Sequence, residues 1–397
     1  MSMQEIKIEG FRSLARVTWR PGKLNVVIGP NGSGKSNLLR ALGFLRAAAL
    51  GKLPDEILRA GGIAPLLHDR AAPQIRWAIT TSPVEEDRLV EALHYQLTLK
   101  PLGATSAYRV DDEILVTPPA RGMVLLSRQQ GSTFVLDSHD VSVDMGQGGV
   151  SDEQPLLAMF TGPFVHRTIG AFRERLTSWG IYHDLRVDQQ APLRQAVVSR
   201  VEDRLADDGQ NLVNVLHTHY TGNRDFKQTV DASMRAAFGL DYEELVFPPA
   251  ADQRVQLRVR WRSLRTEQSA ADLSDGTLRF LLLLAILGNP KPGDLVAIDE
   301  PEIGLHPRML AIVAELAIEA AEHTQVVLTT HSPELLDAFG KEVPTTTVAR
   351  SVSGKTELAV LGAKELAEWL GDYRLGASFR SHELEAMMAS GDPEAAA

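Results

Sequence analysis

Residues 29–36 read Gly29-Pro30-Asn31-Gly32-Ser33-Gly34-Lys35-Ser36, and this stretch decides the fold because it matches the pattern G-x-x-x-x-G-K-[ST] at every fixed position. An apolar run at 24–28 precedes it, and a helical pattern at 35–49 follows it. The order strand, glycine loop, helix makes an anion site, because consecutive backbone N–H groups and the positive end of a helix converge. The alternative is a Gly/Ser turn that carries a lysine by chance, and the flanking strand and helix argue against it.

The loop predicts ATP and Mg²⁺ as ligands. Lys35 is expected to contact the β- and γ-phosphates, and the Ser36 hydroxyl is expected to bind Mg²⁺. Glycines allow the backbone to wrap around phosphates. The remaining candidate nucleotide-binding residues are Asn31, Gly32, Ser33 and Gly34 of this stretch and Asn37, which directly follows it.

Composition favours a soluble protein. The chain has 397 residues, 44% of them hydrophobic, and no cysteine, so it has no thiolate metal site or cysteine nucleophile. The longest aliphatic run, 280–287, is too short to cross a bilayer of about 30 Å. We therefore expect a cytoplasmic protein with no membrane partner. The net charge of −10 means that nucleic acid would need a local basic surface.

Periodicity divides the chain into regions. Strands are expected at 4–10, 14–19 and 24–28, followed by the helix at 35–49 and by an antiparallel β-rich section over 74–137. The polar, glycine-rich residues 138–154 read as a loop. Further elements are expected as helices at 166–178, 211–220 and 225–238, a strand at 181–187, and alternating strands and helices at 295–299, 307–323, 325–329, 333–339, 344–349 and 363–370.

Residues 254–262 alternate strictly between basic or polar and apolar side chains. A strand here would place Arg254, Gln256, Arg258, Arg260 and Arg262 on one face. Two interpretations stay open: arginines paired with the surplus carboxylates, or a surface that contacts nucleic-acid phosphates.

Two acids follow a buried strand. Residues 295–300 form a continuous apolar run that ends in Asp299 and Glu300, as in a parallel strand whose carboxyl end opens into a ligand crevice. Asp299 is a candidate Mg²⁺ ligand, and Glu300 is a candidate to polarise the water that attacks the γ-phosphate. Acidic pairs at strand ends also occur as ordinary loop residues, but a phosphate loop in the same chain favours the catalytic interpretation.

Two more stretches place polar groups beside helix starts. Ser274 and Asp275 precede the helix 278–287, where they suit a helix cap, a charge that complements the helix dipole, or a phosphate contact. His331 follows the strand 325–329 at its carboxyl end, so it could bind a γ-phosphate or be a structural histidine.

Taken together these stretches resemble the motifs of ABC-type ATPases. Gly29–Ser36, Leu273–Thr277, Leu295–Glu300, Gly304–Pro307 and Thr330–Ser332 are similar to Walker A, signature, Walker B, D-loop and switch histidine, in that order. Phe11-Arg12-Ser13 and the signature Leu-Ser-Asp-Gly-Thr resemble the RecF/SMC/OLD-like branch. Within that branch the chain is similar to the bacterial stand-alone AAA-21 group, whose further landmarks resemble residues 208–216 and 370–376.

The resemblance implies an α/β P-loop NTPase fold of the ABC/SMC head type, with a β-rich section and a helical second lobe inserted between Walker A and signature. It implies segments at 1–73 and 266–376 for the ATPase lobe, 74–160 for the β-rich section, 161–265 for the helical lobe and 377–397 for a tail.

The resemblance also implies an ATP-dependent homodimer. Ser274, Asp275 and Gly276 of one copy would close on the ATP held by Lys35 of the other. Arg12 and Ser13 would lie near the nucleotide, and Glu300, Lys35 and His331 would be catalytic. The Q-loop glutamine stays open among Gln74, Gln189, Gln190 and Gln210.

The leading hypothesis is an ATPase whose dimer acts on duplex DNA, without sequence preference, or on a partner protein such as a nuclease, in DNA repair or anti-phage defence. One alternative is a transporter nucleotide-binding subunit, which the RecF-like signature and the long middle region argue against. The other is a slowly hydrolysing switch that regulates a partner toxin or nuclease. The lack of coiled-coil arms and of a long C-terminal extension argues against an SMC protein or a self-contained nuclease.

Overall fold

The computed structural model describes residues 2–82, 92–103, 106–117, 122–129, 132–144, 146, 150–340 and 342–361. The chain forms two compact units, each described here by itself. Unit 1 comprises residues 1–22, 27–179 and 347–361, and unit 2 comprises residues 23–26, 180–346 and 362–397. The expected helix 363–370, the landmark 370–376 and the tail 377–397 lie outside the described residues, and the five segments inferred from sequence stay a prediction.

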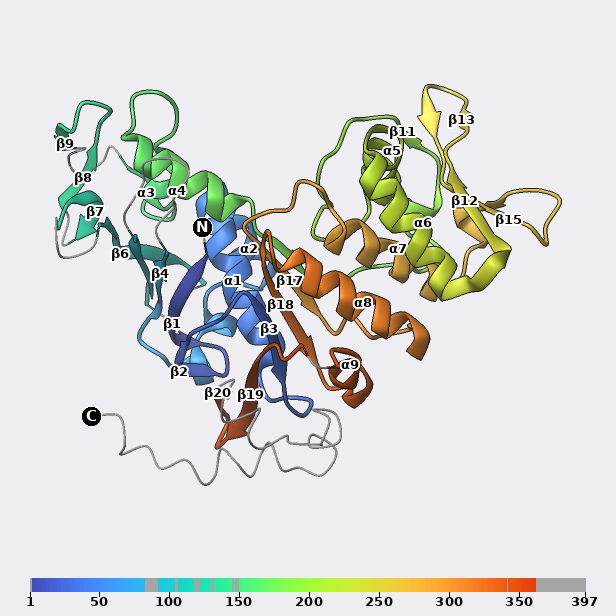
Figure 1. Cartoon of the computed structure of the whole chain (residues 1–397). Helices are drawn as coiled ribbons and strands as arrows, with labels where there is room; N and C mark the ends of the chain where they lie inside the picture. Colours follow the sequence, from blue (N-terminus) through green and yellow to red (C-terminus); the bar gives the residue numbers. More distant parts are fainter. Residues whose placement is uncertain are drawn as a thin grey trace. The chain divides into compact units, whose positions relative to one another are not determined.

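Unit 1 is built on an antiparallel sheet whose described residues form eight strands in the order β2-β1-β4-β5-β6-β7-β8-β9 (Figure 1). The antiparallel section predicted for residues 74–137 is confirmed. The strands are β1 (Met3–Phe11), β2 (Leu14–Trp19), β4 (Ile75–Thr81), β5 (His94–Pro101), β6 (Tyr108–Val116), β7 (Val124–Gln129), β8 (Ser132–Leu136) and β9 (Ser142–Asp144).

Strand β9 corrects the expectation of an uninterrupted loop over 138–154. Its backbone pairs with β8, and Val143 lies opposite Val135. All three residues of β9 are exposed, so no alternation of buried side chains marks it in the sequence.

In unit 1, helix α1 directly follows the phosphate loop and takes part in an aromatic cluster. The ring of Phe44, in α1, lies 5.4 Å from that of Phe11 and 6.4 Å from that of Trp77, centre to centre. Phe11 and Trp77 come from β1 and β4 and are fully buried. The helices of unit 1 are α1 (Lys35–Leu50), α2 (Leu53–Arg59), α3 (Leu156–Met159) and α4 (Arg167–Thr177), with 3-10 turns η1 (Ala64–Leu66) and η2 (His68–Arg70).

Strand β3 (Leu24–Ile28) contributes to both units, because its residues 24–26 belong to unit 2 and its last two residues to unit 1. In unit 1 it is followed in the sheet by β19 (Thr345–Val352, in unit 1 from Thr347) and β20 (Lys355–Leu361). These two strands lie behind the phosphate loop.

Unit 2 contains the parallel strands β10 (Gly180–Tyr182), β17 (Leu295–Asp299) and β18 (Gln325–Thr330), with β3 as the next strand. Every residue of β18 and the first four of β17 are buried, as expected for strands covered on both faces. Because β17 and β18 run in register, Asp299 lies beside Thr329 at their carboxyl ends.

Helices and small sheets complete unit 2, where α7 and α8 lie side by side (Figure 1). The helices are α5 (Leu212–Gly222), α6 (Arg224–Phe238), α7 (Asp275–Leu287), α8 (Pro307–Ala320) and α9 (Pro333–Ala338), with 3-10 turns η3 (Pro192–Arg194), η4 (Gly239–Asp241) and η5 (Ala270–Asp272). The short strands are β11 (Val197–Val198), β12 (Tyr242–Val246), β13 (Pro249–Ala250), β14 (Arg254–Val255), β15 (Arg258–Trp261) and β16 (Gln268–Ser269).

Two predicted strands of unit 2 are shorter than expected. Of the segment 181–187, only residues 181–182 are in the sheet, as the end of β10. Leu185 packs instead beside Gly209. The strand 254–262 is broken at residues 256–257, where the chain crosses from the β11-β14-β13 sheet to the β12-β15-β16 sheet. The alternation is real, but it spans two sheets.

Candidate functional site

The phosphate loop of unit 1 has the backbone that its glycines permit. Gly29, Gly32 and Gly34 have φ values of 153°, 82° and 100°. Helix α1 begins directly after Gly34 with no side-chain cap. Its first N–H groups are therefore not occupied by a capping side chain and suit an anionic ligand.

The back of this loop is closely packed. A Cβ on Gly34 would lie 1.9 Å from Thr356 Oγ1, and one on Gly29 would lie 2.2 Å from the carbonyl oxygen of Ala349. A Cβ on Gly32, in contrast, would meet nothing within 4 Å. Gly34 and Gly29 are thus required by close packing against β20 and β19, and Gly32 lies on the open side.

Lys35 is folded back over the loop. Its side chain is buried, and Nζ donates hydrogen bonds to the carbonyl oxygens of Gly29 at 2.6 Å and Pro30 at 3.2 Å. Among the described residues, the buried Ser33 hydroxyl has no hydrogen-bond partner. A cation and a buried hydroxyl within a cradle of this backbone shape fit nucleotide phosphates.

Ser13 lies against the loop, and Arg12 precedes it in the chain. Ser13 Oγ lies 2.7 Å from Thr356 Oγ1 and accepts a hydrogen bond of 2.8 Å from Asn37 Nδ2. Arg12 has φ of 47°, and its buried Nε lacks a hydrogen-bond partner within the described part of the chain. Burial, followed by the charge of Arg40, lowers the pKa of Arg12, so a bound anion there would be stabilised by two neighbouring cations.

Unit 2 brings Asp299, Glu300 and His331 together. Thr329 Oγ1 donates to Asp299 Oδ1, and His331 Nδ1 lies 3.1 Å from Glu300 Oε1. Glu300 has φ of 48°, and its N–H donates to the carbonyl oxygen of Thr329 at 3.1 Å. The hydrogen bonds therefore fix both the strand-end acid and the residue after it.

Glu302 is a member of this cluster that the sequence did not single out. Its Oε1 accepts hydrogen bonds from Thr330 Oγ1 at 2.5 Å and from the N–H of His331 at 3.3 Å, and its Oε2 is buried with no partner among the described residues. Burial raises the pKa of this carboxyl, and the hydrogen bonds only partly offset that effect. Its position two residues after Glu300 was the available signal.

A cavity of about 190 Å³ lies at the carboxyl end of β17 within unit 2. Asp299 and Glu300 line it together with Arg279 of α7 and the residues that follow β10, His183 and Asp184. The parallel order of β10 and β17 places these groups at one edge of the sheet.

The signature turn of unit 2 combines a helix cap with two close neighbours. Ser274 caps α7, because its Oγ accepts a hydrogen bond of 3.1 Å from the Thr277 N–H. Asp275 pairs with Arg194. A Cβ on Gly276 would lie 2.6 Å from the carbonyl oxygen of Gly304, so the first turn of α7 contacts the turn that follows β17.

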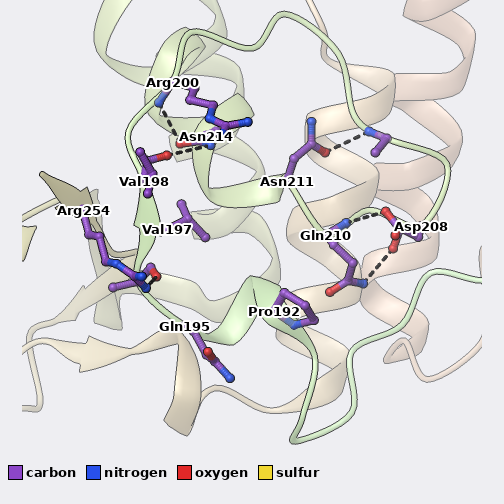
Figure 2. Close-up of a pocket in the computed structure, with 12 residues that line it drawn as sticks. Pro192, Gln195, Val197, Val198, Arg200, Asp208, Gln210, Asn211, Asn214 and Arg254 are labelled. Atoms are coloured by element: carbon purple, nitrogen blue, oxygen red, sulfur yellow. Dashed lines mark hydrogen bonds between the residues drawn. The ribbon is translucent and has the colours of Figure 1, made fainter. Parts of the chain in front are cut away.

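Asp208, Gln210 and Asn211 line a separate cavity of about 430 Å³ within unit 2, where Figure 2 shows them opposite Val197 and Arg254. Gln210 Nε2 donates to the carbonyl oxygens of Arg186 at 2.9 Å and Asp208 at 2.8 Å. This side chain therefore holds the chain segment before η3. The identity of the Q-loop glutamine stays open.

The basic face expected at 254–262 is partly neutralised. Arg260 pairs with Glu244 and, at 2.7 Å, with Glu267, and Arg254 Nη1 donates to the carbonyl oxygen of Ala196 at 3.1 Å. For Arg260, pairing with carboxylates is therefore confirmed.

Two features are absent from the described residues. These residues contain no group of three or more His, Cys, Asp or Glu side chains that could hold a metal ion by themselves. No helix in them is both long and apolar enough to span a bilayer.

The fold and the phosphate loop define a P-loop NTPase of the ABC/SMC head type. At residues 24–82 and 166–337, more than half of its length, the chain matches the model of the AAA_21 family, described as "AAA domain, putative AbiEii toxin, Type IV TA system". The chain belongs to this family. The resemblance inferred from the motifs is thereby confirmed.

Solved structures and a curated relative agree with this assignment. An SMC head bound to the C-terminal winged-helix domain of ScpA is similar at a TM-score of 0.58 and 13% identity, over 93% of this chain and 100% of that chain. The Pyrococcus furiosus SMC head with an extended coiled coil, bound to the C-terminal domain of ScpA, gives 0.53 and 12%, over 93% and 98%. The DNA replication and repair protein RecF of Moorella thermoacetica is 48% identical over 50 residues, 12% of this chain and 13% of RecF. The chain is thus a P-loop ATPase of the RecF/SMC type.

Proposed function

We propose that the protein binds and hydrolyses Mg²⁺·ATP, and that ATP joins two copies of the chain head to head. The observation that carries this proposal is the pair formed by Glu300 and His331, 3.1 Å apart, directly after a buried parallel strand. A carboxylate in this setting, in a chain that also has a complete phosphate loop, is suited to polarise a water molecule.

The residues present fit the substrate and its metal. Lys35, the N–H groups of residues 32–36 and Arg12 provide cationic and donor groups for the phosphates. The Ser36 hydroxyl and the Asp299 carboxylate are oxygen ligands of the kind that Mg²⁺ prefers. When bound, Mg²⁺ would neutralise charge that develops on the phosphate oxygens.

In the reaction, Glu300 would orient the attacking water and accept its proton. His331 would hold the Glu300 carboxylate and hydrogen-bond the γ-phosphate. The buried Glu302 carboxyl supports the backbone of His331, because its Oε1 accepts a hydrogen bond from the His331 N–H. Loss of the γ-phosphate would then release His331, which gives the cluster a way to sense the nucleotide state.

The composite site needs a second copy of the chain. Ser274, Asp275 and Gly276 lie at the N-terminus of α7, where the N–H groups and the Ser274 hydroxyl suit a phosphate. The partner copy would supply that phosphate on its own Lys35. Dimerisation would therefore depend on ATP and be reversed by hydrolysis.

The dimer would act on duplex DNA or on a partner protein. The RecF relative is named for DNA replication and repair, which supports the first setting. The family description names a type IV toxin–antitoxin system, and one of the similar SMC heads is bound to a winged-helix domain, which supports a protein partner in repair or defence.

Glu300→Gln tests the hydrolytic role. The variant should bind ATP as the wild type does, because the phosphate loop is unchanged, and should hydrolyse it about 10²–10⁴-fold more slowly, as for the loss of a general base. Light scattering should then detect an accumulated ATP dimer. Wild-type turnover in Glu300→Gln would refute the assignment.

Mixing two inactive variants tests the composite site. Lys35→Ala removes ATP binding, and Ser274→Arg places a bulky cation at the phosphate contact. Each variant retains the half that the other lacks, so a mixture should regain ATPase activity through one complete site per heterodimer. Folded variants that stay inactive at every ratio would exclude a two-copy site.

A further inference from the structure

Arg194 of unit 2 is a buried arginine outside the recognised motifs. Only 5% of its side chain is exposed. Its Nη1 donates to the carbonyl oxygens of Ala270, Ala271 and Leu273 at 3.1, 3.2 and 2.8 Å, and its Nη2 donates to Asp275. One side chain thus binds four residues of the turn that leads into α7 and contains Ser274.

The same guanidinium also holds its own segment. Its Nε donates to the carbonyl oxygens of Val187 at 2.9 Å and Asp188 at 3.0 Å. Only arginine offers donors on three nitrogens in one rigid plane, so lysine cannot make this set of bonds. Arg194 therefore ties residues 187–188 to residues 270–275.

The segment that carries Arg194 is fixed in turn by Gln210. Gln210 Nε2 donates to the carbonyl oxygen of Arg186 at 2.9 Å, and Gln210 Oε1 accepts from the N–H of Leu193 at 3.4 Å. Figure 2 shows Gln210 beside Asp208, with Pro192 of η3 lining the same cavity. Gln210 is thereby connected, through η3, to the signature turn.

We propose that Arg194 is the positioning residue of the signature turn, and that Gln210 acts through it. This inference rests on the proposed two-copy ATP site. Without the guanidinium, three carbonyl groups of the turn lose their shared donor and the turn can adopt other shapes. The Ser274 hydroxyl and the first N–H groups of α7 would then no longer be preorganised for the partner's phosphate.

The first experiment compares Arg194→Lys with Arg186→Ala, a matched control in the same segment. The control removes an arginine whose side chain is 56% exposed and whose Nε lies 3.5 Å from Asp188 Oδ2. Arg194→Lys should bind ATP within about twofold of the wild type, while its ATP-dependent dimerisation and ATPase rate fall about tenfold or more, since several charge-assisted hydrogen bonds are lost. Arg186→Ala should match the wild type.

Gln210→Ala leaves Arg194 in place and should shift dimerisation in the same direction by a smaller factor. It keeps the inference testable if Arg194→Lys does not fold. Wild-type dimerisation and turnover in folded Arg194→Lys would overturn the inference, as would wild-type behaviour of Gln210→Ala where Arg194→Lys does not fold.

Mixing separates a signature defect from a general one. Arg194→Lys, and likewise Gln210→Ala, should regain activity with Lys35→Ala, which supplies an intact signature turn, and should gain none with Ser274→Arg, which does not. If Arg194→Lys regains activity with neither partner while Ser274→Arg and Lys35→Ala restore each other's activity, the positioning role of Arg194 is overturned. The two-copy site would not be affected by that result. Failure of that last pair as well would overturn the proposed two-copy site.

Discussion

Two glycines of the phosphate loop differ in what surrounds them, although both have left-handed backbone. At Gly34 (φ 100°) a Cβ would overlap Thr356 Oγ1, whereas at Gly32 (φ 82°) it would point into open space. The pair therefore separates the cost of close packing from the cost of backbone strain.

Gly34→Ala should lower the free energy of unfolding by about 2–4 kcal/mol, because overpacking adds to left-handed strain. Gly32→Ala should cost about 1 kcal/mol, since it adds only strain. Urea denaturation without nucleotide measures both, and equal losses would show that Thr356 moves aside freely.

Glu302 makes stability depend on pH. Burial raises its pKa in the folded protein above the ordinary value of 4.5, so the native state holds this proton more tightly than the unfolded chain does. The stabilisation by this group is complete below the unfolded pKa and is lost as the pH rises through the folded pKa.

Glu302→Gln should remove that loss, because a neutral amide carries no buried charge at any pH. The variant should gain stability relative to the wild type as the pH rises from about 4, and the gain should level off above the folded pKa of Glu302. Chemical denaturation at a series of pH values measures this difference. A pH-independent difference would show that Glu302 titrates normally.

At the scale of elements, helix α7 begins with a serine that has a structural task of its own. Ser274 Oγ accepts the N–H of Thr277, which is sufficient to explain a serine at this position. Stability and dimerisation must therefore be measured separately.

Ser274→Ala should destabilise the protein by about 0.5–2 kcal/mol through the lost cap. Ser274→Asp should keep the cap and the stability, and should abolish ATP-dependent dimerisation because its carboxylate would face the partner's phosphates. Thermal unfolding and light scattering with ATP give the two readouts. An ATP dimer of Ser274→Asp would leave this serine as a helix cap.

The sequence predicted elements well where local periodicity matched one sheet or helix. The strand at 24–28, the loop after it and helix α1 have the predicted limits within one residue. The strand at 254–262 was wrong as one element, because alternation cannot reveal a crossing between sheets. Helices α2 and α3 and strand β12 gave no strong period and were missed.

The candidate site shows the same contrast between residues that a local sequence pattern marks and residues that no local pattern marks. The phosphate loop, the two acids Asp299 and Glu300, and His331 all belong to local patterns, so they could be named from the sequence. Arg194 could not, because its partners lie 6–81 positions away along the chain and no local motif marks a buried arginine.

At the scale of the whole molecule, charge limits any binding to DNA. The net charge is −10, and Arg260 of the basic strand is already paired with Glu244 and Glu267. Contact with phosphates would have to compete with these pairs.

We expect duplex DNA binding to be weak, independent of base sequence and reduced further by salt. Replacing Arg258, Arg260 and Arg262 together by Ala should lower the affinity and the slope of its salt dependence. Fluorescence anisotropy over a range of salt concentrations measures both, and unchanged affinity in the folded triple variant would mean that DNA binds elsewhere.

The bond between Thr356 and the phosphate loop has a consequence for the newly made chain. Thr356 Oγ1 donates to the Ser33 carbonyl oxygen across 323 positions of sequence. A ribosome that adds about 5–20 residues per second needs roughly 15–65 s to cover that interval. For that time the loop exists without the hydroxyl that closes it from behind, so the nascent protein acquires its finished nucleotide cradle only after Thr356 has been synthesised.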